Sequence, residues 1–344
     1  MRTSALCRAL VASIFCMPLL SRAEASLAIY GLLDTTVRYA THAGAGGRHL
    51  ASMNDGAFTG SRLGFRGSED LDGGLKAFFS LEQGFDPSSG MLTQTNAAAN
   101  YGQSAAPAGR TFGREALVGL SAGNAGTLTV GRQYTLANLY SSRFQPNANP
   151  NQEVFALLVG HQLIRQDNTV KYAVDIGAFS ASISRTLGEG MSGSSWAIAG
   201  AYKAGAMDLA AYASAMDNFD KSETRRILGL GATFELTEGW KAYLGTMRRH
   251  DRVSGQTNQV WVGALSYSAG SFVYTLSGGE DRQRRVAEGA RQLAWLHVDY
   301  LLSKRTDVYA VIDANRITGA YPLPTFMTQR GLQRGAELGM RHRF

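Results

Sequence analysis

The last residues of the chain alternate between two kinds of side chain. Reading back from the C-terminus, Phe344, His342, Met340, Leu338 and Ala336 occupy every second position, and arginine, glycine or glutamate fills the positions between them. This period of two predicts a β-strand with one face toward an apolar medium and the other toward water. A soluble sandwich would alternate as well, so this strand alone does not decide between a soluble and a membrane protein.

Short alternating segments of this kind recur along the chain, each bounded by Gly, Asn, Asp or Ser clusters. No segment after the first 25 residues has 18 consecutive apolar residues or a long helical period. The pattern therefore predicts an all-β fold. The sixteen predicted strands are 27–39, 61–69, 75–85, 110–121, 127–134, 168–176, 179–187, 196–204, 207–216, 226–236, 240–250, 259–268, 271–279, 292–302, 307–316 and 335–344.

The connections between these strands alternate in length. Short ones such as 70–74, 237–239 and 303–305 alternate with long polar ones, which are 40–60, 86–109, 135–167 and 317–334. Proline cannot donate to a strand ladder. The prolines after residue 25 all fall in the long connections: Pro87, Pro107, Pro146, Pro150, Pro322 and Pro324. Tight turns at one end and long loops at the other are typical of an outer-membrane barrel.

Such a sheet must close on itself, because an unpaired backbone group in hydrocarbon costs several kcal/mol. We therefore expect a sixteen-stranded antiparallel transmembrane β-barrel, wide enough to hold water. In the first strand, charge falls on one face only, with Asp34 and Arg38, which we assign to the lumen. Aromatic residues near strand ends are expected to form an interfacial girdle: Tyr39, Trp196, Trp240, Trp261 and Tyr300. A soluble sixteen-stranded protein is the alternative, and the apolar outward faces argue against it.

The N-terminus has the three parts of a secretory signal peptide: basic Arg2 and Arg8, an apolar run over 9–20, and small residues before a cleavage site after Ala25. We expect a cleaved leader, 1–25, and a single barrel domain, 26–344. Both cysteines lie in the leader, so the mature chain has no disulfide or Cys-based metal site.

Cleavage also removes three arginines and one glutamate, which lowers the formal net charge from +7 to +5. The remaining basic residues are scattered, unlike the concentrated patch of a nucleic-acid binder, so no nucleic-acid partner is expected.

Several short motifs recur along the chain in a characteristic order and spacing. They lie in 61–71, 73–77, 112–114, 118–120, 131–134, 168–172 and 302–306, together with the terminal Phe344. Each motif is weak alone, but their order and spacing together resemble those of Gram-negative trimeric general porins, especially the β-proteobacterial ones. The similarity covers essentially the whole mature chain.

The resemblance implies a homotrimer of barrels in the outer membrane, each with its own pore narrowed by an inward-folded third external loop. That loop corresponds to about 134–166, which contains Tyr134, Arg143 and His161. In the family, arginines on the wall face acidic residues on this loop. By position, Arg62, Arg114 and Arg165 resemble that ladder, with Arg38 and Arg66 as additions. The resemblance also implies that Phe344 is an assembly signal for the barrel assembly machinery, and that the barrel contacts outer-membrane lipid.

The chain departs from the family pattern on the acidic side of this arrangement. Glu153 is the only carboxylate between Tyr134 and Gln166. Several arginines facing one glutamate would make the constriction positive, so we expect a preference for anions. In the alternative, some arginines pair with wall carboxylates and only brace the loop, which leaves weak selectivity. The candidate partners are Asp34, Glu82, Glu115 and Asp167.

Signals for catalysis are weak, and we expect no enzyme activity, no cofactor and no metal. The six histidines are dispersed without ligand spacing, and no nucleophile elbow or phosphate-binding loop is present. His297 and Asp299 share a face, which suits general base chemistry but is more typical of polar lumen lining.

The expected function is passive diffusion of small hydrophilic solutes and ions through a water-filled pore. The alternatives are a substrate-specific channel, and a plugged barrel that acts as a receptor or adhesin. Whether 134–166 narrows the lumen or fills it separates the channel from the plugged barrel.

Overall fold

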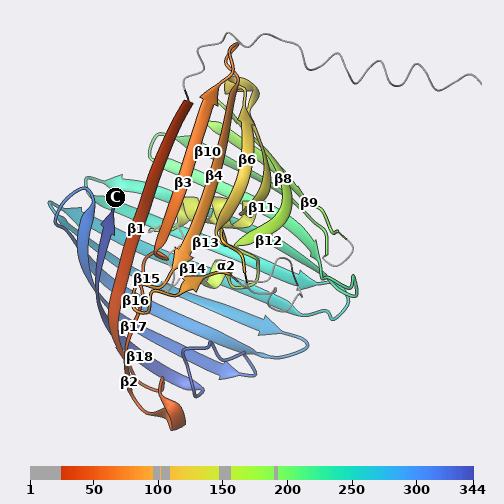
Figure 1. Cartoon of the computed structure of the whole chain (residues 1–344). Coiled ribbons are helices and arrows are strands. Elements are labelled where there is room, and N and C mark those ends of the chain that lie inside the picture. Colours follow the sequence, from red (N-terminus) through yellow and green to blue (C-terminus); the bar gives the residue numbers. More distant parts are fainter. Residues whose placement is uncertain (1–24, 96–100, 102–108, 147–155, 190–192) are drawn as a thin grey trace, which may run out of the picture.

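The computed structural model describes residues 25–95, 101, 109–146, 156–189 and 193–344, and within them the chain forms one closed antiparallel sheet (Figure 1). Sixteen long strands build the wall, and two short strands, β2 and β5, lie in long connections. The predicted sixteen-stranded barrel is thus confirmed. The wall strands are β1 Ala25–Ala40, β3 Arg62–Asp70, β4 Lys76–Phe85, β6 Glu115–Ser121, β7 Thr127–Tyr134, β8 Arg165–Ile176, β9 Phe179–Thr186, β10 Ser195–Ala204, β11 Met207–Asp217, β12 Thr224–Thr237, β13 Trp240–Asp251, β14 Thr257–Ala269, β15 Phe272–Arg284, β16 Gly289–Leu301, β17 Thr306–Gly319 and β18 Gly331–Arg343.

The first and last strands close the barrel. β1 pairs with β18 from Leu32↔Arg343 to Ala40↔Gly335. On its other edge, β1 pairs with β3 over its first half and with β2, Leu50–Asp55, over its second half. The terminal Phe344 extends the closure, because its backbone exchanges two hydrogen bonds of 3.1 Å with Gly31. Both end strands therefore find the partners that a membrane setting demands.

Most strand boundaries agree with the sequence-based prediction within a few residues, and two differences are larger. The strand predicted from residue 110 begins only at Glu115, because residues just before it are held by side chains: Gln83 accepts from the Gly113 N–H at 3.1 Å. The strand predicted to end at 279 continues to Arg284, since Glu280–Gln283 also pair with β16. β2 and β5, Leu92–Thr93, were not predicted, because they lie in segments read as loops.

The outward face of the sheet is apolar, and the inward face carries buried charged residues as well as an apolar core cluster. On β1, Leu27 is 70% exposed and Ile29 64%, whereas the alternate residues Asp34 and Arg38 are buried. The predicted girdle residues are all exposed. At the short-turn end, aromatic rings pair across strands, as in Trp240 with Tyr267, whose centroids lie 4.6 Å apart. No helix in the described part of the chain is long and apolar enough to cross a membrane.

The described parts of the connection between β7 and β8 pack against the buried face of the strands that follow it. They contain α1 (Leu136–Ser141), η3 (Ser142–Phe144) and α2 (Ala156–Val159). The Thr135 side chain caps α1 by accepting from the Asn138 N–H at 3.2 Å. α1 lies against β9, β10, β11 and β12, and α2 against β13, β14 and β15. The described part of the segment is thus docked on seven strands that follow it in the sequence.

One aromatic side chain fixes the middle of this segment. Phe144 is fully buried, and it lies over Gly231 of β12 and Gly245 of β13. A Cβ on Gly231 would come within 2.3 Å of the Phe144 ring, and one on Gly245 within 2.9 Å. The two glycines therefore make the hollow in the wall that receives the ring.

A second segment also turns onto the buried face. Residues 56–61, between β2 and β3, place Phe58 against Trp295, His297 and Tyr309, with ring centroids 4.2–5.8 Å away. The Asp34 carboxylate holds this segment by accepting from the Thr59 N–H at 2.9 Å. The contact of Phe58 with the inner wall was not predicted, because 40–60 has the pattern of a loop.

Candidate functional site: an arginine cluster on the inner wall

Three of the predicted ladder arginines gather around one carboxylate. The Arg114 Nε donates to Glu82 Oε1 at 2.6 Å, and an Arg62 nitrogen lies 3.9 Å from the same oxygen. β3 and β4 place Arg62 and Glu82 on neighbouring strands, and Arg114 comes just before β6. Glu82 therefore shares its one negative charge between two arginines.

Arg165 joins this group, and among the residues that the structure describes it has no carboxylate of its own. The Tyr134 hydroxyl accepts from Arg114 Nη2 at 2.9 Å and from Arg165 Nη2 at 2.5 Å. The Arg165 guanidinium also stacks over the Tyr134 ring at 4.2 Å, and its Nε has no hydrogen-bond partner within the described ranges. With Arg62, Arg114 and Arg165 against Glu82, the cluster carries a formal net charge of about +2.

Arg66 lies next to this cluster. Its guanidinium stacks at 4.1 Å over the Tyr30 ring, and the Tyr30 hydroxyl donates to Glu82 Oε2 at 2.9 Å. An adjoining hollow of about 440 Å³ is lined by Arg66, Ser80, Glu115 and Thr129, among others. Arg62 and Arg66 are the more exposed members, whereas Arg114 and Arg165 are buried and act through their field.

Arg38, expected as an addition to the ladder, is paired with carboxylates outside this cluster. It is buried and forms ion pairs with Asp313 and Glu337, the former at 2.6 Å. Two carboxylates more than balance its charge. The expected lumen face of Arg38 is correct, but its charge is neutralised by residues 275 and 299 positions away.

The loop residues Arg143 and His161 are also paired with the wall. Arg143 makes a bidentate contact with Asp208 of β11 at 3.0 Å. His161 bonds to Asp281 through Nε2, and its Nδ1 lies 3.2 Å from Arg249 Nη1. Both side chains therefore fasten the segment instead of adding unpaired charge to the lumen. The predicted acidic residue, Glu153, lies outside the described residues.

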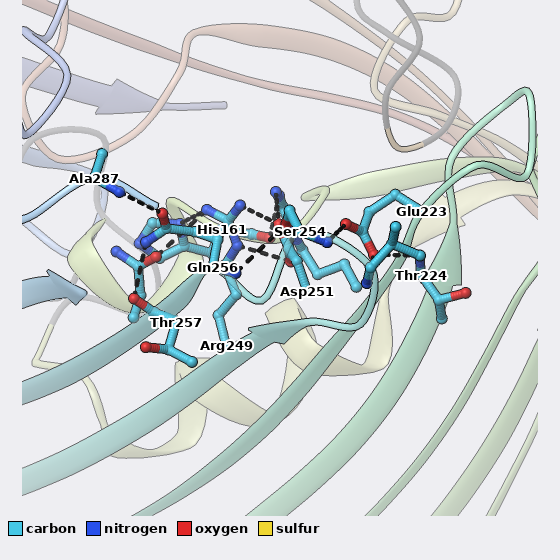
Figure 2. Close-up of polar contacts among 12 residues, drawn as sticks. His161, Glu223, Thr224, Arg249, Asp251, Ser254, Gln256, Thr257 and Ala287 are labelled. Atoms are coloured by element: carbon cyan, nitrogen blue, oxygen red, sulfur yellow. Dashed lines mark hydrogen bonds and ion pairs between the residues drawn. The ribbon is translucent and has the colours of Figure 1, made fainter. Parts of the chain in front are cut away.

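The His161 contact is part of a larger polar network (Figure 2). Asp251 accepts from Arg225 at 3.0 Å and also bonds to Arg249, and Arg225 donates to the His161 carbonyl at 3.2 Å. The same picture shows Glu223, which lies just before β12 and accepts from the Val253 and Ser254 N–H groups at 2.8 and 2.7 Å. Slight burial raises the pKa of Glu223, but these hydrogen bonds outweigh it and hold the pKa below its usual range.

One of the wall carboxylates named as alternative partners, Glu82, pairs with a ladder arginine, Arg114. Asp167 pairs instead with Arg110 at 2.8 Å and with Arg132 at 2.5 Å, which are not ladder residues. Asp34 and Glu115 instead accept from hydroxyl groups, those of Tyr309 and Ser80. Pairing is thus extensive, and the excess of positive charge remains at Arg62 and Arg165.

The possible catalytic pair is covered. His297 is 1% exposed beneath Phe58, and Asp299 lies 3.3 Å from Arg341 Nη2. In the described part of the chain, no hydrogen bond joins the two residues. The described residues contain no group of three or more His, Cys, Asp or Glu residues arranged to hold a metal ion.

Comparison with known proteins places the chain in a family. A family model described as Gram-negative porin matches residues 8–320. An outer membrane porin protein of Bordetella pertussis is 32% identical over 170 residues, which are 44% of this chain and 40% of that protein. Outer membrane porin protein 32 of Delftia acidovorans is 38% identical over 110 residues, 32% of this chain and 26% of that protein.

Solved structures agree in fold. An anion-selective porin from Comamonas acidovorans superposes with a TM-score of 0.72 at 21% identity, over 93% of this chain and 100% of the other. The trimer form of OmpT from Vibrio cholerae gives 0.69 at 13% identity, over 93% and 99%. At these identities the likeness concerns the fold alone. The family match covers most of the chain, and the shared fold agrees with it. The chain belongs to the Gram-negative porins, which places it in the bacterial outer membrane.

Proposed function

We propose that the protein is a water-filled channel for passive diffusion of small hydrophilic solutes and ions, with a preference for anions. The observation that carries the proposal is the arginine cluster on the inner wall, where Arg62, Arg114 and Arg165 face one carboxylate, Glu82. Low-dielectric walls focus the field of such a cluster into the lumen, so mobile anions concentrate there and cations are depleted. The anion-selective neighbour supports the same preference.

The segment 134–166 is the proposed constriction. Its helices lie on the buried face of β9–β15, and its side chains Arg143 and His161 are fastened to Asp208 and Asp281. A segment held in this way would leave the side of the lumen lined by β3, β4, β6 and β8 as the route for solutes. That side carries Arg62 and Arg66, the two more exposed arginines.

We further propose a leader, 1–25, removed on export, and a homotrimer assembled in outer-membrane lipid. The trimer form of the Vibrio neighbour supports this assembly. Phe344 would present the last strand to the barrel assembly machinery before its backbone closes on Gly31. A trimer would migrate on a gel as a detergent-resistant species that collapses to the monomer on boiling.

Swelling of proteoliposomes in sugars of increasing size tests the channel. An open, sieving pore gives swelling rates that fall steeply with solute mass, for neutral sugars of unrelated stereochemistry. Entry of one sugar alone would favour a substrate-specific channel. No swelling from folded protein would favour the plugged receptor or adhesin, in which 134–166 and 56–61 together close the lumen.

A further inference from the structure

A group of arginines interrupts the apolar outward face of the barrel at its long-connection end. Arg226 on β12, Arg248 on β13, and Arg282 and Arg284 on β15 are exposed and alternate with inward residues such as Ile227 and Asp281. These four residues are called the outer arginine patch. They lie outside the barrel, so they take no part in the inner cluster.

Strand register brings the patch together. Gln259 of β14 pairs with Arg248 on one side and Arg282 on the other, and Thr257 pairs with Arg284. Arginines two strands apart are about 10 Å from each other, a span that a headgroup with one or two phosphates can bridge. A hollow of about 420 Å³ occupies this place. It is lined by Arg248, Thr257, Asn258, Gln259, Trp261, Glu280, Arg282 and Arg284.

The charge of the patch is mostly unbalanced. Glu280 lies 2.7 Å from Arg282, and its other oxygen accepts from Gln292 at 2.7 Å. Among the residues that the structure describes, Arg226, Arg248 and Arg284 form no ion pair. Their inward neighbours differ, since Arg225 and Arg249 are both paired with Asp251. Four arginines against Glu280 leave a formal excess of about +3.

The patch lies where the apolar belt ends. Leu228, which pairs across the strands with Arg248, is 60% exposed, and Trp261, which pairs with Glu280, is 61% exposed. A ring of aliphatic side chains followed by tryptophan and then arginine matches the passage from hydrocarbon to headgroups. Unpaired arginines at that depth require anions, and guanidinium groups bind phosphate oxygens in bidentate geometry.

We propose that the outer arginine patch binds the phosphorylated headgroup of an anionic lipid in the leaflet at the long-connection end. The phosphates would bridge Arg248 and Arg284 across the hollow, with Gln259 and Thr257 between them and the acyl chains lying along Leu228 and Trp261. Position favours a lipid over a soluble anion, because the patch is continuous with the apolar belt. The inference does not depend on the pore being open.

The test uses the detergent-solubilised full-length protein and two probes, lipid A with both phosphates and the same lipid without them. Arg248→Gln/Arg284→Gln removes two charges that have no ion pair, so no carboxylate is left without its partner. Arg185→Gln/Arg334→Gln removes two other outward arginines near the same end, outside the patch. Binding is followed by native mass spectrometry, and folding by heat-dependent migration on a gel.

We expect the native protein to prefer the phosphorylated lipid. Arg248→Gln/Arg284→Gln should weaken this binding about 25-fold, at about fivefold for each arginine, and Arg185→Gln/Arg334→Gln should not. Arg248→Lys/Arg284→Lys keeps the charge and should retain most of the affinity. Equal binding of phosphorylated lipid by the native protein and Arg248→Gln/Arg284→Gln would overturn the proposal. Binding of inorganic phosphate as tightly as the lipid would also overturn it. A loss of oligomers with unchanged lipid affinity would overturn it too, and would assign the patch to contact with a second copy of the chain.

Discussion

The charge of the inner arginine cluster can be removed while Glu82 keeps its ion-pair partner Arg114, and this is the most selective perturbation of the channel. In the described part of the chain, the Arg165 guanidinium bonds to the Tyr134 hydroxyl and stacks on its ring, and Arg62 lies 3.9 Å from Glu82, which keeps its 2.6 Å bond to Arg114. Arg62→Gln/Arg165→Gln therefore takes the cluster from a formal charge of about +2 to about zero and leaves the Arg114–Glu82 pair in place. Arg62→Gln/Arg165→Gln should leave folding unaffected, in contrast to removal of Arg114.

The size of the effect follows from Coulomb's law. A chloride ion about 6 Å from a unit charge in water gains about 0.7 kcal/mol, which screening in about 0.1 M salt reduces to about 0.4. Two charges contribute about 0.8 kcal/mol, and a potassium ion loses a similar amount. The two effects sum to about 1.6 kcal/mol, so the anion-to-cation permeability ratio should fall about 15-fold.

The assay is the reversal potential of single channels in a KCl gradient. Arg185→Gln/Arg316→Gln is the matched control, because both arginines are exposed on the outward face and lose the same charge. We expect the control to keep the native reversal potential and Arg62→Gln/Arg165→Gln to move it toward zero. An unchanged potential in Arg62→Gln/Arg165→Gln, with normal conductance, would refute the assignment of selectivity to this cluster.

Three further predictions concern the loops and the closure of the barrel. Gly231→Ala should displace Phe144, whose ring lies 2.3 Å from the new Cβ position, and should raise conductance and current noise in single-channel recordings. The control Gly200→Ala, where the nearest atom to the new Cβ is 3.7 Å away, should behave as native. A Gly231→Ala channel with native conductance and noise would contradict the docking of Phe144. Phe344→Ala should slow barrel assembly, measured as folded species on a gel over time, because its ring covers Gly31, and native kinetics would count against this role. The lowered pKa of Glu223 means that the stabilisation from its ionised carboxylate is present above its unfolded pKa, near 4.3, and is lost as pH falls through the folded pKa. Amide exchange at Val253 should therefore differ between the native protein and Glu223→Gln at pH 7 and converge near pH 2. A difference that persists near pH 2 would contradict the role of the Glu223 carboxylate in holding this amide.

The wall of the barrel could be predicted from the sequence because lipid and water impose a period of two on each strand. Asp34 and Arg38 were assigned to the inner face from alternation alone, and both are buried. Strand ends were harder to predict, since polar ends such as Glu280–Arg284 lack the alternating apolar residues that mark a strand. The pairing of Glu280–Gln283 with β16 extends that strand, and pairing partners are not visible in one strand's pattern.

The interior was less predictable because its contacts join distant parts of the chain. Arg38 finds Asp313 and Glu337 only through the closed barrel, and Phe144 depends on two glycines in strands about 90 and 100 residues later. One signal for the missed inner segment was present: Phe58 is an isolated aromatic residue between Gly56 and Gly60 in a polar connection. Residue type alone also could not separate inner from outer arginines at Arg225–Arg226 and Arg248–Arg249, where only strand phase decides.

The most direct test of the account is the reversal potential of the native protein in a planar bilayer with a KCl gradient. The account predicts open channels, in steps of three if the trimer is intact, with a potential that favours chloride. A potential that favours potassium would contradict the anion preference assigned to Arg62, Arg114 and Arg165. Folded protein without conductance would contradict the channel itself.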